Sequence, residues 1–138
     1  MKSIEQQARA FQRVREAHAL ETIEDYVELI ADLSETDGAA RAVDLSRRFG
    51  VTPATVNATL KRLERDGYLT SAPYRAVFLT EKGRDLAARC RARHIIVRDF
   101  LIALGIDPVT ADEDAEGIEH HVSADTLATF ARFIAERD

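Results

Sequence analysis

The stretch RAVDLSRRFGVTPATVNATLKRLERDGYLTSAPYRAVFLT, residues 41–80, decides the fold. Its opening segment is short and amphipathic and ends at Gly50, since glycine readily takes the left-handed conformation that closes a helix. Thr52 and Pro53 then start a second helix: threonine can cap free backbone N–H groups, and proline suits the first helical position. The apolar stripe of this second helix comprises Val56, Leu60 and Leu63. The expected helices span about 41–49 and 53–66.

The periodicity changes after Gly67. Segments rich in β-forming residues at 68–70 and 76–80 flank a turn at 71–75, which predicts a two-stranded hairpin. Two helices joined by a short turn and followed by a hairpin are typical of a winged helix-turn-helix, whose second helix enters the DNA major groove. The expected fold class is mainly α with a small β-hairpin wing.

The net charge of −5 conceals a strong segregation along the chain. Residues 1–40 carry a net charge of −5, residues 41–98 carry +8, and residues 99–138 carry −8. A basic centre between acidic ends favours a nucleic-acid surface in the centre and a cationic ligand near the flanks. Two plainer interpretations stay open: uneven surface solvation, and a helix-turn-helix that contacts protein.

Polar side chains on the outer side of the second helix are candidates for base contacts. Asn57 can pair with adenine, and Thr55 can contact a base or a thymine methyl group. Lysine and arginine side chains position a protein on the phosphates instead. The expected DNA-binding residues are Arg47, Arg48, Thr52, Ala54, Thr55, Asn57, Lys61, Arg62 and, at the hairpin tip, Arg75.

Helices are also expected on both sides of this module. The spacing of apolar residues predicts one helix over about 4–34 and another over about 81–104. Capping residues predict two shorter helices, one after Asp107 and one after Ser123 or Asp125.

Acidic and histidine side chains recur in these flanking helices at the spacing of metal ligands. Glu116, Glu119 and His120 lie at i, i+3 and i+4, on one face of a helix, and Asp25 and Glu28 form another i, i+3 pair. With His94 they offer four carboxylates and two imidazoles, enough negative charge to balance two divalent cations. Each piece alone also fits a solvated helix face or a hydrogen-bonded core histidine.

With these motifs in place, the chain resembles the DtxR family of metal-dependent repressors, and specifically its manganese branch, the manganese transport regulators. The resemblance covers about residue 21 to the C-terminus and is most specific at EDYVE (24–28), RH (93–94) and AEGIEHH (115–121). It implies a homodimer. It also implies six metal ligands, namely Asp25, Glu28, His94, Glu116, Glu119 and His120.

The resemblance also indicates the metal. The iron-responsive branch has sulfur-bearing residues where this chain has Asp25 and Glu116, and oxygen donors suit Mn²⁺. We expect Mn²⁺, two ions per subunit, with Fe²⁺, Zn²⁺ or Cd²⁺ as competitors. Cys90 is expected to be a buried small hydrophobe. His121 either orients a ligand or simply lies at a helix end.

Three parts are expected: a helical N-terminal extension over 1–20, a winged helix-turn-helix domain over 21–80, and a helical metal-binding and dimerisation domain over 81–138. We expect no SH3-like third domain, which the iron-responsive branch has. A single cysteine excludes an intramolecular disulfide, and the sequence has neither a membrane-length apolar run nor an apolar signal core. A cytoplasmic protein with no membrane partner is therefore expected.

The function that the resemblance implies is manganese-responsive regulation of transcription. Mn²⁺ would order the dimer for binding a palindromic double-stranded DNA operator and so repress manganese uptake genes. The protein would be no enzyme and would have no small-molecule substrate. Two alternatives stay open: a winged-helix regulator that responds to Fe²⁺ or to an organic ligand, and, more remotely, a di-metal carboxylate enzyme.

Overall fold

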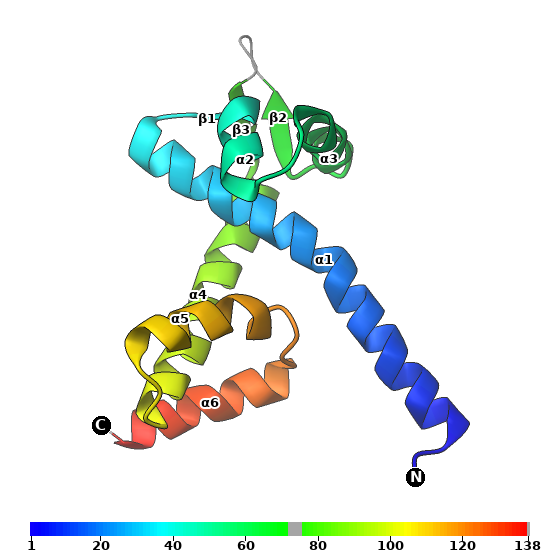
Figure 1. Cartoon of the computed structure of the whole chain (residues 1–138), viewed down its shortest axis with the longest axis vertical. Coiled ribbons are helices and arrows are strands. Elements are labelled where there is room, and N and C mark those ends of the chain that lie inside the picture. The colour runs from blue at the N-terminus through cyan, green and yellow to red at the C-terminus, as the bar shows by residue number, and fades with distance from the viewer. Residues whose placement is uncertain (72–75, 138) are drawn as a thin grey trace. The chain divides into compact units, whose positions relative to one another are not determined.

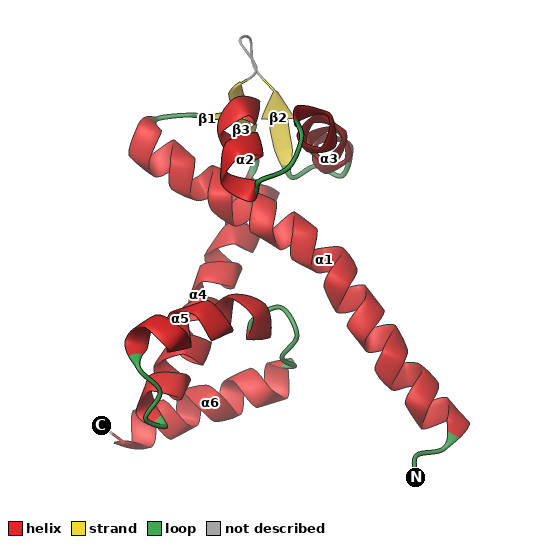
Figure 2. Ribbon diagram, viewed as in Figure 1, coloured by secondary structure: helices red, strands yellow, loops and turns green. Residues whose placement is uncertain are grey.

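The computed structural model describes residues 1–71 and 76–137, and these residues are mainly helical (Figure 1). They form six helices and one three-stranded sheet (Figure 2), which confirms the expected fold class. The helices are α1 (Ile4–Asp37), α2 (Ala42–Phe49), α3 (Pro53–Arg65), α4 (Glu81–Ala103), α5 (Pro108–Ile118) and α6 (Ala124–Arg137). The strands are β1 (Ala40–Arg41), β2 (Leu69–Ser71) and β3 (Ala76–Leu79).

The chain forms two compact units. The central unit comprises Ile23–Arg89, and the terminal unit comprises Met1–Thr22 together with Cys90–Asp138. Helices α1 and α4 each contribute to both units. None of the helices in the described part of the chain combines the length and the apolar character that a bilayer crossing requires.

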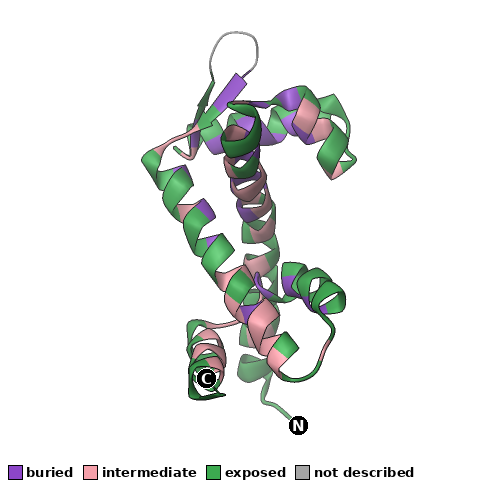
Figure 3. Cartoon of the chain, turned by 90° about the vertical axis from the view of Figure 1, so that its left-hand side faces the viewer, coloured by how far each residue is buried: buried purple, intermediate pink, exposed green. Residues whose placement is uncertain are grey.

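The core of the central unit joins its helices to its sheet. Val56, Leu60 and Leu63 on α3 are buried, as their spacing predicts. Helix α1 packs onto the same core, where Tyr26 stacks on Phe49 with ring centroids 4.5 Å apart. Figure 3 shows buried positions in purple on the helices of this unit. The core therefore fixes α3 by its inner side and leaves its outer side in solvent.

The sheet contains one strand that the sequence pattern does not indicate. The strand order is β1-β3-β2, with antiparallel pairing throughout. We expected the helix that ends before Gly50 to begin at about Arg41, but this residue is extended, with φ −123° and ψ 150°, and α2 begins one residue later. The reason is its pairing with Ala76 in β3. A two-residue strand is too short to show a periodicity in sequence.

Caps define the starts of three helices. Thr52, Asp107 and Ser123 each accept a hydrogen bond from the backbone N–H three residues later, at 3.2, 3.1 and 3.2 Å. The predicted caps of Thr52 and Asp107 are confirmed, and of the two candidates for α6 it is Ser123 that caps. In the terminal unit, α6 packs on α4 through stacked rings of Phe100 and Phe130, whose centroids are 3.9 Å apart.

Candidate metal centre and nucleic-acid interface

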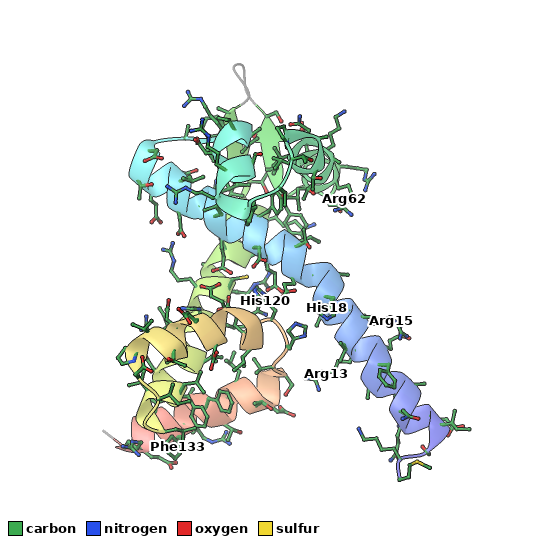
Figure 4. The ribbon with its side chains drawn as sticks, viewed as in Figure 1. Arg13, Arg15, His18, Arg62, His120 and Phe133 are labelled. Atoms are coloured by element: carbon green, nitrogen blue, oxygen red, sulfur yellow. The ribbon has the colours of Figure 1, made fainter. Side chains whose placement is uncertain are left out.

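The outer side of α3 and the end of α2 present the predicted DNA-binding residues to solvent. All of those in the described part of the chain are exposed: Arg47, Arg48, Thr52, Ala54, Thr55, Asn57, Lys61 and Arg62. Figure 4 labels Arg62 on α3. Arg75 lies outside the described residues. The exposed residues combine cationic side chains, a type able to contact phosphates, with Asn57, an amide able to read a base edge.

Two of these residues also hold the start of α3 in place. The Thr52 hydroxyl oxygen accepts a hydrogen bond from the Thr55 N–H, and the same hydroxyl donates to the Thr55 hydroxyl at 3.0 Å. Gly50, with φ 67°, closes α2 just before this cap. The turn between the two helices is therefore fixed by local chemistry, which orients the exposed face of α3.

In the terminal unit, α4 and the end of α5 bring a histidine and two glutamates together. His94 Nδ1 lies 2.9 Å from Glu119 Oε2 and 3.5 Å from Glu116 Oε1. His120 Nε2 lies 3.4 Å from the other oxygen of Glu119. Helix α5 ends at Ile118, earlier than expected, but Glu119 keeps helical backbone angles and so preserves the spacing. The cluster of His94, Glu116 and Glu119 has potential ligand atoms within 4.8 Å of one another.

Burial gives Glu119 unusual electrostatics. Its side chain is fully buried, and burial together with the charge of Glu116 raises its pKa to about 7, against the opposing influence of His94 and His120. Burial alone would lower the pKa of His94, but the hydrogen bond to Asp112 and the charges of the three neighbouring carboxylates raise it overall. In the metal-free cluster, burial thus favours the protonated form of Glu119, and the surrounding carboxylates favour the protonated form of His94.

The donors fit a divalent cation. Glu119 Oε1 is buried and makes no hydrogen bond within the described part of the chain. Leaving a carboxylate oxygen in that state is costly unless a proton or a cation compensates it. Two carboxylates and an imidazole are a ligand set for Mn²⁺ or a related first-row ion. His120, whose side chain is 1% exposed, borders the same buried oxygen.

Asp112 belongs to this cluster although we did not predict it. Its Oδ1 lies 2.7 Å from His94 Nε2, on the far side of the imidazole from Glu119. A carboxylate at this position fixes the orientation of a ligating histidine and keeps a proton on its second nitrogen. The signal was available in the sequence, because Asp112 precedes Glu116 by four residues and so shares its helix face.

The remaining two predicted ligands lie in the other unit. Asp25 and Glu28 are one helical turn apart on α1, in the central unit, and both are partly exposed. Their participation in a metal site therefore stays a prediction from the sequence. Cys90 is fully buried, as expected.

A winged-helix unit with an exposed basic helix, joined to a helical unit with a carboxylate–imidazole cluster, defines a metal-responsive DNA-binding protein. Residues 18–77 match the iron dependent repressor N-terminal DNA binding domain, and residues 80–138 match the metal binding and dimerisation domain of the same family. The chain therefore belongs to the iron-dependent repressor family. It is a transcriptional regulator and not an enzyme, and its family implies DNA and a second copy of the chain as partners.

Known proteins place the chain more closely within the family. It is 50% identical over 131 residues to the transcriptional regulator MntR of Salmonella typhimurium, which covers 95% of this chain and 83% of that protein. It is 39% identical over 106 residues to the HTH-type transcriptional regulator MntR of Listeria monocytogenes, covering 77% and 75% of the two chains. A solved manganese-dependent transcriptional repressor in complex with manganese superposes with a TM-score of 0.74 at 27% identity. That match covers 82% of this chain and 52% of the other, so the chain spans about half the length of that structure.

Proposed function

We propose that this protein is a manganese-responsive repressor that, as a homodimer, binds a palindromic operator and represses manganese uptake genes. The observation that supports this most directly is the buried, proton-retaining Glu119 beside His94 and Glu116, in a chain that also carries a DNA-binding unit. The similarity to two MntR proteins supports manganese as the signal.

The proposed ligands are Asp25, Glu28, His94, Glu116, Glu119 and His120. Four of them lie in the terminal unit around Glu119, whereas Asp25 and Glu28 are assigned from the sequence. Their four carboxylates match the charge of two Mn²⁺ ions per subunit. Fe²⁺, Zn²⁺ and Cd²⁺ are expected competitors, because affinity alone does not favour manganese in the series of divalent ions.

The switch follows from what these side chains do in the two states. Without a cation, the neighbouring carboxylates disfavour a negative charge on Glu119, whose pKa is raised, and favour a proton on His94, whose pKa is also raised. Cation binding would require Glu119 to lose its proton and His94 Nδ1 to be deprotonated, so that its lone pair is available. His94 Nε2 would keep its proton, directed toward Asp112. The bound cation supplies the positive charge that makes the ionised, converged arrangement stable. A cation increases the population only of the conformation that binds it more tightly than the other conformations do. We propose that this conformation is the one that binds DNA.

The DNA-binding unit supplies the readout. Asn57 and Thr55 would contact base edges, and Arg47, Lys61 and Arg62 would contact phosphates. A two-fold dimer implies half-sites about one helical turn, or a multiple of it, apart. A regulator that reads chromosomal DNA works in the compartment that holds that DNA, so we place it in the cytoplasm.

Manganese stoichiometry tests the ligand assignment. Free Mn²⁺, measured by its paramagnetic resonance signal in a titration of the full chain, should report two sites per subunit. Glu119→Gln should lose binding, and Glu113→Gln, the same change at an exposed position of α5, should bind as the wild type does. Equal binding by both variants would refute the assignment, and tighter activation by Fe²⁺ than by Mn²⁺ would favour an iron signal.

A further inference from the structure

We propose a second metal site, for Zn²⁺, formed by His18, Glu21 and His121 in the terminal unit. His18 Nδ1 lies 3.6 Å from Glu21 Oε2, and His121 Nε2 lies 3.7 Å from Glu21 Oε1. One ligand atom from each of the three residues lies within 4.8 Å of the other two. None of the three belongs to the proposed manganese ligands.

The separations suit a small transition-metal ion. Zinc bonds of about 2.0–2.2 Å in tetrahedral geometry place neighbouring donor atoms roughly 3.3 Å apart. The separations to the two oxygens of Glu21, 3.6 Å from His18 and 3.7 Å from His121, exceed this by a few tenths of an ångström. The three donor atoms lie within 4.8 Å of one another, so rotation of the side chains has to bring them together around the ion. The fourth position would be water or a second ligand.

The donor chemistry differs from that of the manganese centre. Two imidazoles and one carboxylate form a nitrogen-rich set, which suits zinc, whereas the manganese centre is dominated by oxygen donors. The three side chains are partly or largely exposed, at 64%, 31% and 31%, so an ion can reach them from solvent. The alternative is an ion pair between the histidines and Glu21. An ion pair requires a proton on each histidine nitrogen that faces Glu21, whereas a metal site requires a free lone pair on that nitrogen.

Side-chain contacts join His121, which follows α5, to the N-terminal part of α1. His18 and Glu21 are one turn apart on α1, and Figure 4 shows His18 on the side of α1 facing the segment between α5 and α6. The Arg13 guanidinium donates a 3.5 Å hydrogen bond to the His121 carbonyl oxygen. The rings of His18 and His121 meet edge to face, with centroids 4.9 Å apart. The two imidazoles are thus already positioned on one side of Glu21.

Such a site would give a role to residues whose function the sequence left open. Zinc would cross-link the N-terminal part of α1 to the turn that carries His121 and, directly before it, His120. Occupancy would restrain the backbone of a manganese ligand. This coupling rests on the proposed function, but the zinc site itself does not.

Zinc binding to the full chain tests the site. The number of tightly bound Zn²⁺ ions per subunit should fall by one in His18→Gln and in Glu21→Gln, with affinity at that site weakened more than about tenfold. Glu16→Gln, the same type of change on an exposed position of α1, should leave the count unchanged. In parallel, Zn²⁺ should shift the imidazole nuclear resonances of His18 and His121.

The manganese count separates this proposal from the proposed function. His18→Gln should retain the wild-type Mn²⁺ stoichiometry, which also shows that the variant is folded. An unchanged zinc count in both His18→Gln and Glu21→Gln would overturn the zinc site and leave a simple ion pair, whatever the manganese result. If the wild type bound no Mn²⁺ but still bound one more Zn²⁺ ion than the two variants, only the proposed function would be overturned.

Discussion

Replacing Glu119 by glutamine should make the metal-free protein more stable while abolishing its stabilisation by manganese. The carboxyl group is fully buried, and its pKa is raised from 4.5 to about 7. One pKa unit corresponds to about 1.4 kcal/mol, so ionising this group in the folded state costs up to roughly 3 kcal/mol relative to the unfolded chain. Glutamine has nearly the same shape and carries no charge.

The sign of the pH dependence follows from linkage. The folded state binds the Glu119 proton more tightly than the unfolded state, so its contribution favours folding at low pH and is lost as pH rises from 4.5 through about 7. Glu119→Gln should therefore exceed the wild type in free energy of unfolding by roughly 1–3 kcal/mol at about pH 8, and this advantage should shrink toward zero at about pH 5.

Urea denaturation of the full chain, with chelator or with Mn²⁺, measures both effects. Manganese at about one thousand times its dissociation constant should add roughly 4.1 kcal/mol to the wild type and almost nothing to the variant, so the order of stabilities reverses. The exposed-site control Glu113→Gln should stay within about 0.5 kcal/mol of the wild type in both conditions. A metal-free variant less stable than the wild type at pH 8, with an intact manganese response, would refute the reasoning.

Four further single substitutions test the packing at Gly83, the candidate metal centre and the exposed face of α3. Gly83→Ala should lower the free energy of unfolding by more than about 1 kcal/mol in urea titrations, because a Cβ there would lie 2.2 Å from the Tyr68 carbonyl oxygen; an unchanged midpoint would show that this close approach does not matter. Asp112→Ala should weaken Mn²⁺ binding about tenfold in dialysis, since His94 loses its orienting carboxylate. In DNA-binding assays, Asn57→Ala should reduce operator affinity by about 1–3 kcal/mol with little effect on unrelated DNA, whereas Lys61→Ala should weaken both and reduce the salt slope by about 1.

The fold was largely predictable because its signals are local. Caps such as Thr52 and Asp107 and the apolar stripe of α3 depend on near neighbours in sequence, and the structure confirms them. Strand β1 was missed because its two residues are extended only through pairing with β3, a contact distant in sequence. Nothing within residues 40–41 distinguishes them from the start of the following helix.

The grouping of three candidate ligands on one helix face was predictable from the sequence, but the surroundings of these residues were not. Glu116, Glu119 and His120 follow helical spacing, which the end of α5 nearly preserves. The raised pKa of Glu119 comes from burial against α4, which no sequence spacing reveals. The proximity of His121 to His18 is likewise a long-range contact, since more than one hundred residues separate them in sequence.

Fluorescence anisotropy can measure whether manganese controls DNA binding by this protein. A labelled promoter fragment of a manganese uptake gene is mixed with the full chain, titrated with Mn²⁺ and then treated with chelator. Tight binding should appear with Mn²⁺, disappear with chelator and be absent in Glu119→Gln. Binding that is equally tight with Mn²⁺ and with chelator would contradict manganese control and would reduce the carboxylate–imidazole cluster to a structural feature.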